Sequence, residues 1–128
     1  MRTSLLALVA LLGLSSGVAH ATALSAFHTP GWSAQCFVVG EEAPPALVCA
    51  TPRNGAFVSM QSTVAAKLGN DPGEKGRHDV YAARRLLAFE RYWGFGRLFG
   101  CASHASGLKC WNAVGHGWWI DRSGIRVF

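Results

Sequence analysis

The sequence has few acidic residues and, beyond its first residues, no long apolar run. Only 7 Asp and Glu stand against 12 Lys and Arg. No stretch approaches the roughly 20 apolar residues of a membrane-spanning helix, so we expect no permanent span of a bilayer. The chain lacks the short cysteine pairs of zinc knuckles and, from residue 24 onward, the Gly-x-Ser-x-Gly sequence of many serine hydrolases. We therefore expect no metal site, no cofactor and no serine-hydrolase site.

The first 23 residues have the pattern of a secretory signal peptide. A basic residue precedes an apolar run over residues 5–14, and small residues then form Ala-x-Ala triplets that end at Ala21 and Ala23. We expect cleavage after one of these two alanines and a single small domain over residues 24–128. No cysteine stands at the cleavage site, so a lipid anchor is not expected. The domain is predicted to be secreted, into the periplasm or the medium.

Four cysteines in a small exported domain predict two disulfides, because a modest core needs cross-links in an oxidising compartment. Four cysteines allow three pairings. We expect the two local ones, Cys36 with Cys49 and Cys101 with Cys110, because each pair flanks a turn-rich segment and would face across a hairpin. Each disulfide should stabilise the domain by about 2–4 kcal/mol.

Short aromatic and branched segments alternate with turn signals along most of the chain. Pro30-Gly31, Pro44-Pro45 and Asn54-Gly55 mark turns, and residues 99–128 contain further glycine-bearing turns. Such segments predict antiparallel strands over residues 34–39, 46–50, 56–60 and 108–112, with more strands before the C-terminus. The predicted fold is mainly β: a small disulfide-stapled antiparallel meander or a partly open barrel, with room for one short helix in the middle segment.

The middle of the chain, residues 61–91, has a less regular pattern. Residues 63–68 can form a helical turn, and residues 69–76 have the composition of a surface loop. Residues 79–91 favour a helix by propensity, but their aromatic continuation favours a strand that leads into the final meander. Of these alternatives we favour a strand from about Leu86.

The terminal hairpin alternates in a way that sorts its residues onto two faces. A turn over residues 113–116 predicts Asn112 opposite Trp118, which places Trp111 opposite Trp119. The residues predicted to point inward are Leu108, Cys110, Trp118, Ile120, Ile125 and Val127, and those predicted to point outward are Lys109, Trp111, Trp119, Asp121 and Arg126. The outer indoles are either a binding surface or are covered by another part of the chain.

The two cysteine-bearing regions have a faint mutual likeness. Placing Cys49 on Cys110 aligns Phe57 with Trp118, and in both copies a glycine turn and an aromatic strand follow the second cysteine. This pattern indicates either an internal duplication of a three-strand unit or the general likeness of disulfide hairpins.

The second half of the chain contains Leu87-Ala88-Phe89-x3-Trp93, Phe99-x-Cys101-x-Ser103 and Gly107-Leu108-x-Cys110-x-Asn112-x2-Gly115-His116-Gly117-Trp118, and Phe27-x-Thr29-Pro30 precedes Cys36 near its start. With these residues most of the predicted mature chain resembles a family of small secreted bacterial domains of unknown function. The chain departs from the family at Glu90, where the family tends to have glycine. The resemblance implies a secreted, disulfide-bearing, mainly β domain, and it brings no activity with it.

His116 is the first candidate for a catalytic role, because the glycines on either side are expected to expose its imidazole, and histidine is a common general acid or base in enzymes. The same glycines also suit a plain turn. A nuclease could combine His116 with Glu90, Arg91 and Arg97. A metal site would need His78, His104 and His116 to converge, and no i, i+4 histidine pair supports that arrangement.

These features favour a binding function over an enzymatic one. Residues 61–128 hold ten Lys and Arg against five Asp and Glu, which suits either solubility or contact with polyanions. We expect a monomeric, non-enzymatic envelope or extracellular module whose binding residues are Trp111, Trp119, Lys109 and Arg126. Its expected partner is a glycan, an anionic wall polymer or an extracellular protein, and not nucleic acid. The alternatives are a small secreted phosphodiesterase or nuclease that uses His116, and a purely structural envelope protein.

Overall fold

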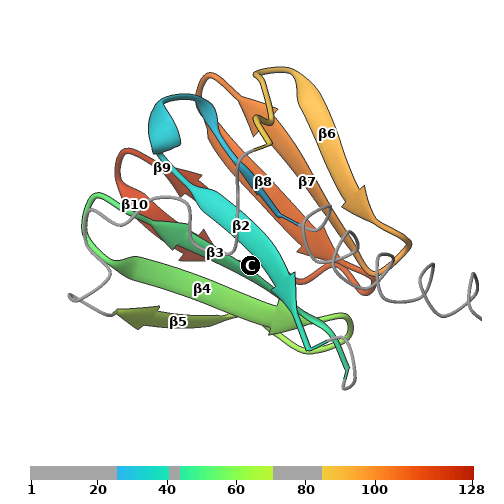
Figure 1. Ribbon diagram of the computed structural model, residues 1–128. Coiled ribbons are helices and arrows are strands. Elements are labelled where there is room, and N and C mark those ends of the chain that lie inside the picture. Colours follow the sequence, from blue (N-terminus) through green and yellow to red (C-terminus); the bar gives the residue numbers. More distant parts are fainter. Residues whose placement is uncertain (1–25, 41–43, 71–84) are drawn as a thin grey trace, which may run out of the picture.

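Two five-stranded antiparallel sheets stack face to face in the computed structural model, which describes residues 26–40, 44–70 and 85–128 (Figure 1). The N-terminal sheet contains β1 (Ala26–His28), β2 (Gln35–Val39), β3 (Ala46–Thr51), β4 (Ala56–Gln61) and β5 (Lys67–Asn70). The C-terminal sheet contains β6 (Arg91–Phe95), β7 (Phe99–His104), β8 (Gly107–Asn112), β9 (Gly117–Asp121) and β10 (Gly124–Val127). A short 3-10 turn, η1 (Pro30–Trp32), joins β1 to β2. The mainly β prediction is confirmed, and both sheets are open.

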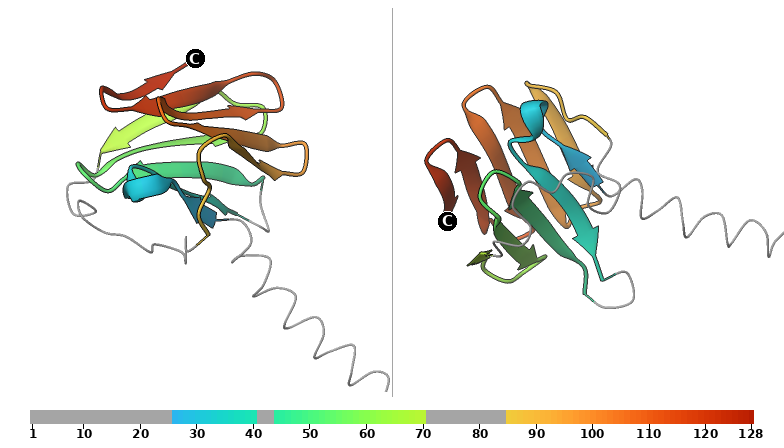
Figure 2. Two further views of the ribbon diagram at one scale, coloured as in Figure 1. Left: turned by 90° about the horizontal axis from the view of Figure 1, so that it is seen from above. Right: turned by 60° about the vertical axis from the view of Figure 1, so that its left-hand side comes forward.

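Each strand pairs with its neighbours in the sequence, so both sheets are simple meanders. Figure 2 shows the two meanders as separate layers when the molecule is viewed from above. Alternation of apolar and polar residues fits the layering in β8, for example, where buried Leu108 and Cys110 flank exposed Lys109. Among the described residues no helix is long and apolar enough to cross a membrane. The predicted signal peptide and its cleavage sites lie outside the described residues.

The core lies between the sheets and is formed by the side chains that point inward from the strands. Phe27, Leu47, Val58 and Trp118 are fully buried there. Aromatic rings from the two sheets meet in it, because the Phe27 and Trp93 centroids lie 5.1 Å apart. The predicted inward set of the terminal hairpin is confirmed for these residues: Leu108, Cys110, Trp118 and Ile120.

Both predicted disulfides are present, and both cross neighbouring strands. Cys36 faces Cys49 across β2 and β3, and Cys101 faces Cys110 across β7 and β8. The two bridges meet in the middle of the core, where the Sγ atoms of Cys49 and Cys110 are 4.0 Å apart. All four cysteines have no solvent exposure. The disulfides therefore hold each sheet together at the point where the two sheets touch.

The two halves of the chain repeat one arrangement, since in each sheet the disulfide joins the second and third strands of a five-strand meander. The alignment that places Cys49 on Cys110 is wrong in matching Phe57 with Trp118. Cys49 pairs with Val58 and Cys110 with Trp118, so the counterpart of Trp118 is Val58 and not Phe57. The turn after the second cysteine is one residue shorter in the C-terminal half. The common arrangement supports an internal duplication, which stays a hypothesis.

The middle segment differs from the expectation at both ends. Residues 63–68 do not form a helical turn; Lys67 and Leu68 begin β5, because pairing with β4 satisfies their backbone groups. The strand favoured from Leu86 begins only at Arg91. Leu86 makes a single parallel bridge with His28, and the positive φ of 63° at Glu90 interrupts the extended chain before β6. Residues 71–84 lie outside the described residues.

The register predicted for β8 and β9 is wrong by two residues. Trp111 faces Gly117 and Lys109 faces Trp119, so the two indoles are diagonal neighbours rather than a direct pair. The turn is shorter than expected because the Asn112 N–H donates to the His116 carbonyl, 2.8 Å away. A shift of two residues leaves every side chain on its predicted face.

On β10, Ile125 packs against the core as expected. Val127 stays 45% exposed at the sheet edge, so its predicted inward burial is wrong. Among the described strands β10 is the last of the C-terminal sheet, so its outer edge has no paired neighbour there.

Candidate functional site

The outer face of the C-terminal sheet carries two rows of side chains that run across the strands. The first row, from β6 to β10, consists of Tyr92, Ala102, Lys109, Trp119 and Arg126. The second consists of Gly94, Gly100, Trp111, Gly117 and the terminal Phe128. We call the four rings of these rows, Tyr92, Trp111, Trp119 and Phe128, the aromatic face.

Glycines allow the two indoles to lie against the sheet. A Cβ atom added at Gly100 would come within 2.7–2.8 Å of three ring atoms of Trp111. A Cβ atom at Gly107 would come within 3.1 Å of the Trp119 ring. Both indoles therefore occupy the space that a side chain on the neighbouring strand would take, and both are half-buried. Tyr92 and Phe128 are more open, at 76% and 49% exposed.

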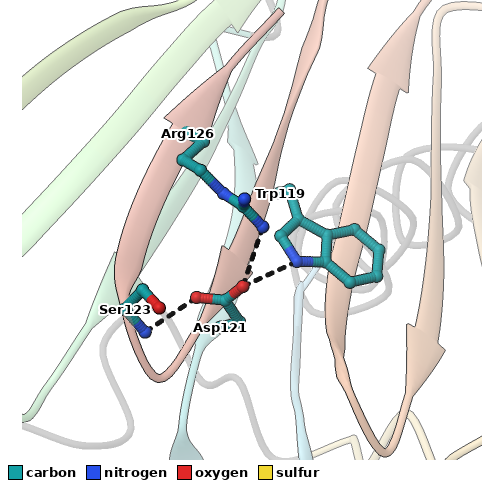
Figure 3. A network of polar contacts seen from close by, with 4 residues as sticks. All are labelled: Trp119, Asp121, Ser123 and Arg126. Carbon is teal, nitrogen blue, oxygen red and sulfur yellow. Dashed lines mark hydrogen bonds and ion pairs between the residues drawn. The ribbon is translucent and has the colours of Figure 1, made fainter.

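Asp121 holds the Trp119 side chain in place through a network of polar contacts (Figure 3). Its Oδ2 atom accepts hydrogen bonds from Trp119 Nε1 at 2.9 Å and from the Arg126 guanidinium at 2.8 Å. Its Oδ1 atom accepts a bond from the Ser123 N–H at 2.7 Å. The Ser123 N–H, and then the Trp119 and Arg126 donors, hold the pKa of Asp121 below its usual range, against the opposing effect of desolvation. One ionised carboxylate thus orients both an aromatic ring and a cation of the face.

The four residues predicted to bind a partner share this one face. Lys109 lies between Ala102 and Trp119, and its Nζ atom is 5.6 Å from the centre of the Phe128 ring. Arg126 lies on the other side of Trp119, and its side chain is 66% exposed. The aromatic surface is therefore flanked by two cationic groups that remain accessible.

The residues of the hydrolase hypothesis lie at opposite ends of the sandwich. His116 is in the β8–β9 turn, at the end of the sheet where β6 and β7 are joined through Arg97. Arg91 pairs with Ser103 at the other end of β7, and Glu90 precedes it there. The structure brings Glu90 together with His104, whose Nδ1 atom is 3.4 Å from the carboxylate. No acid–histidine pair forms at His116 among the described residues.

The glycines around His116 have structural explanations. Gly115 has a φ of 91°, which the turn requires. At Gly117 a Cβ atom would collide with the Cys110 carbonyl on the paired strand. The backbone thus accounts for both glycines, and His116 itself is half-buried.

Two of the three histidines considered as metal ligands do not converge. His104 and His116 lie at opposite ends of β8, and His78 lies outside the described residues. One group of ligand-type atoms does gather in the described part of the chain, formed by Cys36, Cys49 and Cys110. These sulfurs are already bonded in the two disulfides.

Asn112 has a role that the sequence reasoning missed. Its side-chain N–H groups donate to the carbonyls of Gln61 and Val64 in the opposite sheet, at 2.9 and 3.0 Å. Its Oδ1 atom accepts from the N–H groups of Val114 and His116 within its own turn. The signal was an Asn at the start of a glycine turn, a position where its side chain bonds the backbone. The partner in the other sheet had no signal in the sequence.

Comparisons with protein-family models, with curated proteins and with solved structures found no match to this chain.

Proposed function

We propose that the protein is a secreted, non-enzymatic binding module that holds a polysaccharide with anionic groups against the aromatic face. The observation that carries the proposal is the placement of Trp111 and Trp119, with Lys109 and Arg126, on one open face of the C-terminal sheet. Flat rings suit the apolar C–H faces of sugar rings, and the flanking cations suit carboxylate or phosphate groups on the chain.

The rigidity of the face supports binding. Trp119 is held by the bond to Asp121, and Trp111 by its position over Gly100. Side chains ordered before binding lose less conformational entropy when a partner arrives. An extended polymer could also contact successive rings along the two rows, so weak contacts would add together.

The arrangement favours binding of a polymer over a function in phosphodiester hydrolysis. The candidate base His116 lies far along the sheet from Glu90 and Arg91, so these three residues do not surround one reacting atom. A binding role needs only the exposed rings and cations.

The test is sedimentation of the purified mature protein with an insoluble bacterial cell-wall preparation, before and after protease treatment of that preparation. The double variant Trp111→Ala, Trp119→Ala should bind at least about fivefold more weakly, because two ring contacts of roughly 0.5–1.5 kcal/mol each are lost. Raised salt should also weaken binding by the unaltered protein.

The matched control is Phe57→Ala. Phe57 lies over Gly69 on the outer face of the N-terminal sheet, in the same way that Trp111 lies over Gly100. This variant should bind like the unaltered protein. Equal binding by the double tryptophan variant would refute the proposal, and loss of binding after protease treatment would show that the partner is a protein instead.

A further inference from the structure

A groove of about 330 Å³ opens at one end of the sandwich. Phe89, which precedes β6, lines it, and four other chain segments form the rest of its walls: η1, the β3–β4 turn, the β7–β8 turn and the β9–β10 turn. Two of these segments belong to each sheet, so the groove exists only because the sheets are stacked. Its volume is at the lower end of the range for small-molecule sites, which suits a single sugar ring. We call it the loop-end groove.

Two arginines line the loop-end groove, one from each sheet. Arg53 comes from the β3–β4 turn and Arg122 from the β9–β10 turn. Both are exposed, and within the described part of the chain neither has an ion-pair partner. The carboxylate among the lining residues, Asp121, is bonded to Arg126 at 2.8 Å, so its charge is compensated. The groove therefore has an excess of positive charge.

The other polar groups of the wall also present donors. Asn54 Oδ1 is occupied, because it accepts from the Thr51 hydroxyl at 2.6 Å and from the Ala56 N–H at 3.0 Å. The amide nitrogen of Asn54 is the end that remains available. His104 also lines the groove, with its Nδ1 atom engaged by Glu90. An acceptor-rich ligand fits such a site better than a donor-rich one.

The inner part of the groove is apolar. Leu108 and Ile120 line it from the core, and Phe89, which is 49% exposed, lines its rim. An apolar floor with a few charged donors around it is the usual composition of a site for a polar ring compound.

The geometry points to the loop-end groove as a binding site for an acidic monosaccharide unit, whose carboxylate or phosphate bonds Arg53 and Arg122. The site stands apart from the second row of the aromatic face, since Trp111 is not among its lining residues. It meets the first row at Trp119, whose ring lies 6.3 Å from that of His104. An acidic unit in the groove and a polymer over the rings could therefore belong to one ligand, but the groove's affinity does not depend on the rings.

The test is calorimetric or NMR titration of the mature protein with three probes: glucuronic acid, glucose 6-phosphate and glucose. Both acidic probes, or one of them, should bind at least about tenfold more tightly than glucose, as expected for charge-assisted hydrogen bonds. The preferred acidic probe shows whether the group recognised is a carboxylate or a phosphate. Arg53→Gln and Arg122→Gln should each weaken binding of that probe by about tenfold or more.

The control variant is Arg97→Gln, which removes an exposed arginine from the β6–β7 turn at the opposite end of the sheet. It should bind the acidic probe like the unaltered protein. Equal binding of glucose and the acidic probes, no saturable binding of any probe, or equal losses in all three variants would overturn the inference.

Trp111→Ala separates this inference from the proposed function. It should lower binding to the cell-wall preparation and leave the affinity for the acidic monosaccharide unchanged. Loss of monosaccharide binding in this variant would also count against an independent groove site.

Discussion

Replacing Asn112 with Ala should strongly destabilise the domain, because its side chain ties the β8–β9 turn to the β4–β5 turn of the opposite sheet. The substitution removes four hydrogen bonds: two to the Gln61 and Val64 carbonyls and two from the Val114 and His116 N–H groups. At a net 0.5–1.5 kcal/mol each, the bonds sum to about 2–6 kcal/mol. Both turns border solvent, so water replaces part of this, and we expect a loss of about 2–4 kcal/mol.

Urea denaturation followed by tryptophan fluorescence measures this loss. With a denaturant slope of about 1.5 kcal/mol per molar, the midpoint should fall by about 1.3–2.7 M at an unchanged slope. Val114→Ala is the matched control, because Val114 is in the same turn and is 57% exposed. It should change the free energy of unfolding by less than about 0.5 kcal/mol. A loss of that small size for Asn112→Ala would refute the idea that this side chain braces the two sheets.

Three other predictions follow from single residues. Gly117→Ala should lower the free energy of unfolding by more than about 2 kcal/mol, measured by the same denaturation, because its Cβ atom would collide with the Cys110 carbonyl. Glu90→Val should cost about 1–2 kcal/mol while Glu90→Gly costs less, because φ is 63° there; equal stability of the two variants would contradict this. The pKa of Asp121 is lower in the folded than in the unfolded protein, so its ionised carboxylate stabilises the folded state. This stabilisation is complete above the ordinary pKa of a carboxyl group and is lost as the pH falls through the lowered pKa. Acid titration of Trp119 emission should therefore show a change below about pH 4 that is absent in Asp121→Asn.

Much of the C-terminal sheet was predictable because its information is local. Alternation along β8 and β9 placed Cys110 and Trp118 inside and Lys109 and Trp119 outside, and the structure agrees. The local disulfide pairs followed from turns that bring neighbouring strands together. The exact register was missed, since it depends on how Asn112 closes the turn with backbone and side-chain bonds.

The resemblance noted in the sequence also includes positions with clear physical reasons in the structure. Gly115 and Gly117 serve a positive φ and a close backbone approach, and Asn112 links the sheets. Glu90 stands where the resemblance expects glycine, and its backbone has the left-handed conformation that glycine adopts without strain. Such residues explain a fold and carry no information about an activity.

The amino-acid sequence alone determined most of the strand-and-turn pattern, the disulfide pairs and the face on which the side chains of β8 and β9 lie. These properties depend on residues that are close along the chain, where alternation and turn chemistry act directly. Only the tertiary structure decided that the two disulfides touch, that Asn112 spans the sheets and that Arg53 and Arg122 share one groove. Those relations join segments that are far apart in the sequence, and they arise when the buried faces of two separate meanders are packed together to remove apolar surface from water.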